Sequence, residues 1–159
     1  MQVRVARGDD WLPTVAADDP WHNERPADLS CPATSVLAEY GATELRTSDC
    51  GYITVQTTVA PEVSSWQSSP AGGVCVVVQL AHGAMNGPAG QKGQASIAIG
   101  GEQVWQQPIA LDAPTAILDP KICVDSLAPG TKIHVNVNNH GANAYALFDV
   151  IARFDVGCP

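Results

Sequence analysis

The sequence has few basic residues and little charge of either sign. Lysine and arginine number 8 against 16 aspartate and glutamate residues, which gives a formal net charge of −8, and charged residues make up 15% of the chain. A nucleic-acid surface needs clustered lysine and arginine, and an anionic membrane surface attracts the same clusters. The few, scattered basic residues therefore argue against nucleic acid and against a membrane surface as partners.

Long apolar runs are also missing. The longest run, residues 74–78 with Leu80 and Ala81, is far shorter than the ~20 residues of a transmembrane helix. The first 15 residues lack the apolar segment of roughly 7–15 residues that marks a secretion signal. Either the chain is cytosolic, or Met1 begins a mature form from which a signal has been removed. The cysteines favour the second interpretation, a secreted or cell-surface protein.

The five cysteines form no CxxC motif and no Cys/His spacing suited to zinc. Their dispersed positions favour two disulfides and one remaining thiol. We expect Cys31 to pair with Cys50, which brackets a short segment, and Cys75 to pair with Cys123, since both lie in strand-like runs. The role of Cys158 is then undetermined. Buried thiols in a reducing compartment are the alternative.

Turn formers and short apolar segments dominate what is present. The 159 residues include 14 glycines and 12 prolines, and 45% of the chain is hydrophobic, which suits one packed domain with many turns. Strand-like patterns recur between turn signals. They predict an all-β fold, a single β-sandwich of about eight to nine antiparallel strands, of jelly-roll type. The expected strands are residues 43–48, 50–59, 74–82, 94–99, 102–107, 115–118, 122–126, 131–138 and 144–154.

The first 30 residues differ in character from the rest. They are polar and show no sustained periodicity, so we expect an extended N-terminal arm at residues 1–30 and the sandwich domain at residues 31–159. Trp11 and Trp21 are expected to pin this arm to the domain. Residues 35–40, followed by Gly41, are consistent with one or two helical turns that end at a glycine.

A row of polar side chains is the most informative candidate site. His134, Asn136, Asn138 and His140 alternate with other residues, so a strand would place them on one face. Asparagine is depleted in strands, and its carboxamide can both donate to and accept from a sugar hydroxyl. It also offers oxygen to Ca²⁺. We predict a ligand-binding row, joined by Asn143 from the turn that follows; an ordinary solvated face is the alternative.

Other chemistry has weaker support. His134 and His140 lie roughly 20 Å apart along an extended strand, which argues against a shared metal ion, and the identity of any metal stays undetermined. No G-x-S-x-G elbow, phosphate loop or paired carboxylates stand out, so a binding role is favoured over an enzyme. Trp66, in a loop of serine, glutamine and proline, is a candidate stacking platform for a sugar ring.

The strand pattern over residues 43–154 resembles that of jelly-roll carbohydrate-binding modules. In such modules, sugars are commonly met by exposed tryptophan or tyrosine and by asparagine or glutamine, and Trp66, Asn136 and Asn138 are the positions that match. The resemblance implies a non-enzymatic binding module whose partner is a glycan or cell-surface polymer. The alternatives are a structural subunit of an extracellular filament or coat that self-associates as a homo-oligomer, and, third, a metal-dependent enzyme.

Overall fold

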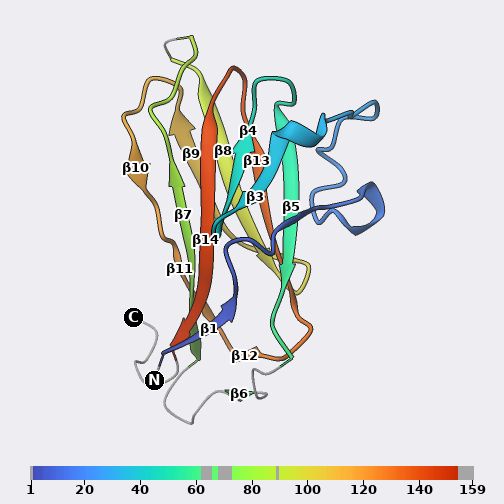
Figure 1. The fold of residues 1–159 in the computed structure, drawn as a ribbon, viewed down its shortest axis with the longest axis vertical. Coiled ribbons are helices and arrows are strands. Elements are labelled where there is room, and N and C mark those ends of the chain that lie inside the picture. The colour runs from blue at the N-terminus through green and yellow to red at the C-terminus, as the bar shows by residue number, and fades with distance from the viewer. Residues whose placement is uncertain (1, 62–65, 68–72, 89, 154–159) are drawn as a thin grey trace.

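The computed structural model describes residues 2–61, 66–67, 73–88 and 90–153, with only the backbone described at 66–67. Two antiparallel sheets pack face to face (Figure 1). Sheet A has the order β10 (Ala116–Ile117), β7 (Val74–His82), β14 (Ala144–Arg153), β4 (Ala42–Arg46) and β3 (Val36–Glu39), with β1 (Gln2–Ala6) on β14 and β11 (Lys121–Val124) on β7. Sheet B has the order β2 (Leu12–Pro13), β5 (Tyr52–Thr58), β13 (Lys132–Asn138), β8 (Lys92–Ile99) and β9 (Glu102–Ala110).

Four smaller elements complete the described chain. The strands β6 (Trp66–Gln67) and β12 (Ser126–Leu127) pair with each other, and two 3₁₀ turns, η1 (Ala16–Asp18) and η2 (Ala33–Ser35), lie in the N-terminal third. Within the described part of the chain, no helix is long and apolar enough to cross a membrane.

The core lies between the two sheets and follows the strand period of two. In β7, Val74, Val76, Val78 and Leu80 are buried in it, and in β13 the same is true of Ile133, Val135 and Val137. Successive side chains of a strand point to opposite faces, so the residues between these positions face outward from the sandwich. The outward faces of the two sheets therefore carry the side chains that are candidates for binding.

The predicted all-β sandwich is confirmed, and each of the nine predicted strands is present. The helical turns predicted at residues 35–40 are wrong, because β3 occupies Val36–Glu39 and pairs with β4. Gly41 has a positive φ of 82°, but it closes a β-hairpin instead of ending a helix. A glycine with positive φ serves both purposes, which is why the sequence pattern misled.

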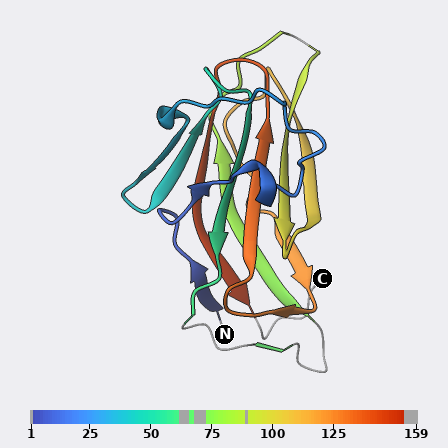
Figure 2. The ribbon, with the colours of Figure 1, turned by 90° about the vertical axis from the view of Figure 1, so that its right-hand side faces the viewer.

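The N-terminal segment pairs with both sheets of the sandwich. β1 joins sheet A beside β14, and the residues after it cross to sheet B, where β2 pairs with β5. Figure 2 shows the arm, in blue, running across the outer face of sheet B in front of β5 and β13. Trp11 and Trp21 are buried, as expected of residues that pin the arm.

The disulfide pattern is half as predicted. Cys31 and Cys50 are bonded, which links the end of the arm to the start of β5. The predicted Cys75–Cys123 bond is wrong, because Cys75 is a buried free thiol and Cys123 is disulfide-bonded, so its partner is not Cys75. The two residues do lie opposite each other on β7 and β11. Cys158 lies outside the described residues.

Candidate functional site

The predicted polar row is divided between a covered part and an exposed part. His134 and Asn136 point to the outer face of sheet B, as the alternation predicts, but their exposed fractions are only 3% and 2%. The arm covers them, since the Thr14 backbone N–H donates to the Thr54 carbonyl at 2.8 Å on the neighbouring strand. Asn138 and His140 are exposed at the end of β13 and just beyond it.

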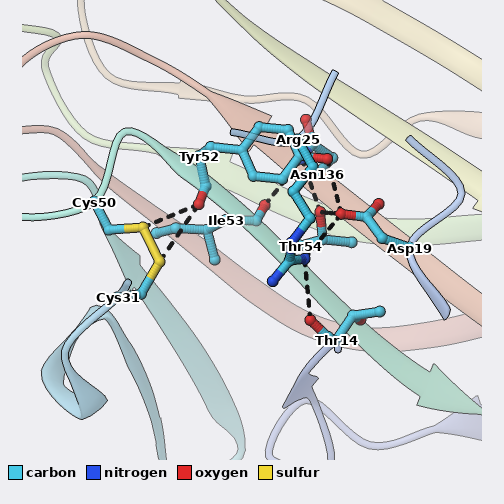
Figure 3. Close-up of a disulfide and its surroundings, with 9 residues drawn as sticks. All are labelled: Thr14, Asp19, Arg25, Cys31, Cys50, Tyr52, Ile53, Thr54 and Asn136. Atoms are coloured by element: carbon cyan, nitrogen blue, oxygen red, sulfur yellow. Dashed lines mark hydrogen bonds and ion pairs between the residues drawn. A yellow bond between two sulfur atoms is a disulfide. The ribbon is translucent and has the colours of Figure 1, made fainter. Parts of the chain in front are cut away.

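A buried ionic cluster holds the arm over this face (Figure 3). The Asp19 carboxylate is fully buried and lies 3.1 Å from the Arg25 guanidinium. It also accepts hydrogen bonds from the Tyr52 hydroxyl at 2.8 Å, from the Thr54 hydroxyl at 3.1 Å and from the Trp21 backbone N–H at 2.9 Å. Burial raises the pKa of Tyr52 well above its usual range, so the phenol stays a donor to Asp19.

Asn136 belongs to the same buried network. Its Nδ2 donates to the Thr54 hydroxyl at 2.9 Å and to the Ile53 carbonyl at 3.3 Å. His134 is different: within the described chain neither ring nitrogen has a hydrogen-bond partner, and burial lowers the pKa of the imidazole. In this conformation, therefore, neither side chain is available to a ligand from solvent.

The two remaining predicted residues lie elsewhere. Asn143 is buried and joins two loops: its side chain accepts from the Asn86 backbone N–H at 2.6 Å and donates to the Asn86 carbonyl at 3.0 Å. Trp66 lies in β6, where its backbone pairs with that of Leu127, and its side chain is outside the described part of the structure. The role of Trp66 in binding stays a prediction.

The histidines, cysteines and carboxylates that the structure describes nowhere form a group of three or more able to hold a metal ion. Asn136 is buried, whereas the carboxamide of Asn138 is exposed. Asn138 therefore keeps the predicted capacity to bind a ligand oxygen or hydroxyl group.

A concave surface on the outer face of sheet A was not predicted. It consists of two hollows of about 470 and 310 Å³ that share the lining residue Ala81, and we call them together the outer trough. Its floor is apolar and made of small side chains from three adjacent strands, namely Ala42, Ala81, Ala144 and Ala146. Its walls and ends are formed by Leu37, Glu39, Tyr40, Gly41, Glu44, Arg46, Gln79, His82, Gly83, Thr115, Ile117, Asp119, Tyr145, Phe148 and Asp149.

Large apolar side chains stand exposed along the outer trough. Tyr40 is 96% exposed, and Ile117 and Phe148 are exposed as well. Tyr40 sits at the tip of the β3–β4 hairpin, which projects away from the sandwich (Figure 2). Aromatic rings left in water beside a concave floor are the groups that stack on flat apolar ligand surfaces.

Backbone strain gathers at the same place. Among the described residues other than glycine, only Tyr40 and Asp119 have a positive φ, of 52° and 35°, and both line the outer trough. Such conformations are unfavourable for side chains with a Cβ and concentrate at functional sites. The Asp119 carboxylate is fixed there, since it accepts a hydrogen bond from the Leu80 backbone N–H at 3.0 Å.

A β-bulge in the central strand β14 places Phe148 and Asp149 in the wall of the outer trough. The pairing of β14 with β7 shifts register between Leu147 and Val150, both of which are buried in the core. Two residues, Phe148 and Asp149, therefore stand between core positions where a regular strand has one, and both line the outer trough. Bulges re-aim side chains in this way and are frequent beside binding sites.

Carboxylates predominate among the charged groups of the outer trough. Arg46 donates two hydrogen bonds to Glu44, at 3.0 and 3.3 Å, which raise the pKa of Arg46. Asp149 lies 3.6 Å from Arg4. With Glu39 and Asp119 included, the surface carries oxygen acceptors suited to hydroxyl groups and opposes an anionic ligand.

The sequence did contain signals for these residues. Tyr40-Gly41 stands between two segments that could each be a strand, and an aromatic residue next to a turn glycine has no core position to fill. Asp149 falls on a position that the alternation of Tyr145 and Leu147 assigns to the core. A carboxylate at such a position indicates that the alternation breaks, which is what the bulge does.

Comparison with known proteins adds information about architecture. No family model matches the sequence, and no curated protein matches it. Among solved structures, the fold resembles the CBM36-1 domain of a multidomain xylanase from the hindgut metagenome of Trinervitermes trinervoides. That likeness covers 99% of this chain and 100% of that one, with 9% identity and a TM-score of 0.47.

Two further solved structures show the range of the resemblance. TmCBM61 in complex with β-1,4-galactotriose matches 80% of this chain and 87% of its own, with 16% identity and a TM-score of 0.42. Dimeric latent PorU from Porphyromonas gingivalis matches 67% of this chain, at 15% identity and a TM-score of 0.41, and the match spans 10% of the PorU chain. Carbohydrate-binding modules are thus among the structures that this sandwich resembles.

Proposed function

We propose that the protein is a non-enzymatic binding module for carbohydrate chains and that it binds them in the outer trough. The observation that carries the proposal is that Tyr40 lines one hollow of the outer trough and Asp119 lines the other, and that these two alone among the described non-glycine residues have positive φ. An aromatic ring and a carboxylate are the two kinds of side chain that a sugar needs, one for its C–H face and one for its hydroxyl groups.

The floor and walls fit a sugar chain in other respects. The alanines of the floor let a flat ligand approach the sheet closely, and Phe148 offers a second ring. The carboxylates disfavour acidic sugars, so a neutral glycan or cell-surface polymer is the expected partner. A secreted or cell-surface location is supported by the Cys31–Cys50 disulfide, because such bonds persist in oxidising compartments.

A glycan array followed by calorimetry on the best ligand tests this proposal, with Tyr40→Asn as the central variant. Asparagine is favoured at the first position of a two-residue hairpin turn, so we expect the free energy of unfolding to be kept or raised by up to ~1 kcal/mol. Loss of the ring should weaken glycan binding by about tenfold.

The matched control is Leu12→Asn, which removes an exposed apolar side chain from β2 on the other sheet. It should leave binding unchanged. Equal binding by wild type and Tyr40→Asn would remove the outer trough as the site, and an array with no retained glycan would contradict the carbohydrate-binding function itself.

One observation favours a structural subunit as a second candidate. Edge strand β9 is 9 residues long, and 7 of these residues are exposed, whereas the edge strands β2, β3, β10 and β11 have 2 to 4 residues. Long open edges without lysine can pair with another chain, here a second copy. Light scattering would then show an oligomer that Val104→Lys dissociates and Val15→Lys, on the exposed arm, does not; a monomer at high concentration rules this candidate out.

A further inference from the structure

The β14 bulge that presents Phe148 and Asp149 is held from outside its own sheet. The Gly8 backbone N–H donates to the Asp149 carboxylate at 2.8 Å, and the Trp11 indole N–H donates to the Phe148 carbonyl at 3.2 Å. Both donors come from the segment that follows β1, at the start of the arm. The extra residue of a bulge leaves backbone groups unpaired; the Trp11 contact supplies a partner for the Phe148 carbonyl, and the Gly8 contact fixes the Asp149 side chain.

Gly8 also contacts the β3–β4 hairpin, whose tip carries Tyr40. Its carbonyl accepts a hydrogen bond from the Thr43 hydroxyl at 2.7 Å. A Cβ at position 8 would collide with the Gly41 carbonyl oxygen and would lie 2.9 Å from the Phe148 backbone. Gly41 is the turn residue next to Tyr40. The absence of a side chain at position 8 therefore allows the Tyr40 hairpin and the Phe148 bulge to approach each other.

We infer that Gly8 and Trp11 are positioning residues for the outer trough: they set the separation and direction of Tyr40 and Phe148 without touching the ligand. The inference rests on the proposed function only for its effect on glycan affinity. The geometric effect stands by itself, because it concerns the ring of Phe148 in the unbound protein. If the rings of Tyr40 and Phe148 are moved away from the sugar, the stacking contact is lost, although the core of the sandwich is retained.

The test compares two matched pairs of variants. Gly8→Ala is paired with Gly51→Ala, in which the new Cβ also meets a backbone carbonyl, that of Asn139 at 2.7 Å, but outside the outer trough. Trp11→Phe is paired with Trp21→Phe, since the Trp21 indole N–H donates to Gln103 at 2.7 Å, away from Phe148. Trp11→Phe keeps a buried ring, so it serves should Gly8→Ala fail to fold.

The readout independent of ligand is ¹⁹F NMR of protein made with fluorophenylalanine. The chain has 2 phenylalanines, and Phe148→Leu assigns the relevant signal. The Trp→Phe variants add a further phenylalanine signal, so Phe148→Leu is combined with each of them to identify the Phe148 signal there. We expect Gly8→Ala and Trp11→Phe to move the Phe148 signal and to weaken binding of the array-selected glycan by about tenfold. Gly51→Ala and Trp21→Phe should leave the signal and the affinity unchanged, even where they lower the melting temperature.

The outcomes separate the two proposals. An unmoved Phe148 signal in both Gly8→Ala and Trp11→Phe overturns the inference, as does a moved signal with unchanged glycan affinity. A moved signal in a protein whose wild type binds no glycan contradicts the proposed function and leaves the positioning role standing.

Discussion

His134 is a titratable side chain that the fold buries without a hydrogen-bond partner in the described chain. Its place in the alternation of β13 was predictable, because Val135 and Val137 mark the core face. Its burial was not, because the residues that cover it come from the arm more than a hundred positions earlier. The polar row is thus predictable as a row but not as a covered one.

The burial of His134 predicts a pH dependence of stability. Burial lowers the pKa of the imidazole, an effect that Lys132 increases and that Asp18 and Asp19 oppose. The unfolded chain therefore binds the proton more tightly than the folded chain. With respect to His134, the free energy of unfolding is therefore highest above pH ~6.5, the ordinary histidine pKa. It decreases as the pH falls below that value and through the lower pKa of the folded protein.

Urea unfolding of wild type and His134→Val between pH 5 and pH 8 measures the contribution of His134 to the pH dependence of stability. The difference in free energy of unfolding between the two proteins should change with pH below ~6.5, in the direction that favours the variant in acid. His140→Gln is the control, since His140 is exposed, and it should run parallel to wild type. A constant difference between wild type and His134→Val would show that His134 does not titrate differently on folding.

At the scale of elements, local patterns fixed most of the strands. The apolar run of β7, the alternation of β13 and the Gly100-Gly101 hairpin, where both φ values are positive, were all readable because each depends on neighbours in sequence. The short strands β1, β2, β3 and β6 and the β14 bulge were missed, since short strands and register shifts are decided by pairing partners far along the chain.

Asp19 joins the arm to sheet B, because its buried carboxylate accepts hydrogen bonds from the Tyr52 and Thr54 hydroxyls of β5. Arg25, which is also in the arm, supplies the counter-charge. Asp19→Asn should lower the free energy of unfolding by roughly 3 kcal/mol, because it leaves a largely buried guanidinium without its counter-charge. Hydrogen exchange should quicken at the Trp21 amide, which Asp19 holds at 2.9 Å. The neighbouring variant Asp18→Asn is the control.

Asp18 is half exposed, and its carboxylate lies as far as 4.0 Å from the Lys132 ammonium group. Because this ion pair is weak, replacing Asp18 should change the free energy of unfolding by less than ~1 kcal/mol. Equal effects of the two variants would mean that burial adds nothing to the Asp19 pair. Exchange that quickens over the whole sandwich, rather than over residues 14–25, would show that the arm does not open separately from the core.

At the scale of the whole molecule, one sheet face is closed and the other is open. The arm closes sheet B through long-range contacts such as Trp21 with Gln103, while sheet A keeps the outer trough. Composition and periodicity indicate two sheets with outward faces, but they do not say which face an aperiodic segment will cover. That choice depends on side-chain complementarity between distant segments, and for this reason the sequence did not show that His134 and Asn136 would be covered.

The cysteines give a test of the whole assembly. Cys75 is a buried free thiol, whereas Cys31, Cys50 and Cys123 are in disulfides. In the native protein these four cysteines should therefore resist alkylation, and unfolding without reductant should expose a thiol that peptide mapping assigns to Cys75. After reduction, Cys31, Cys50 and Cys123 should become labelled as well. Cys75→Ser is the control that abolishes the unreduced label. Labelling of Cys75 in the native protein would show that β7 is accessible, and labelling of Cys31 or Cys50 before reduction would show that the bond between them is absent.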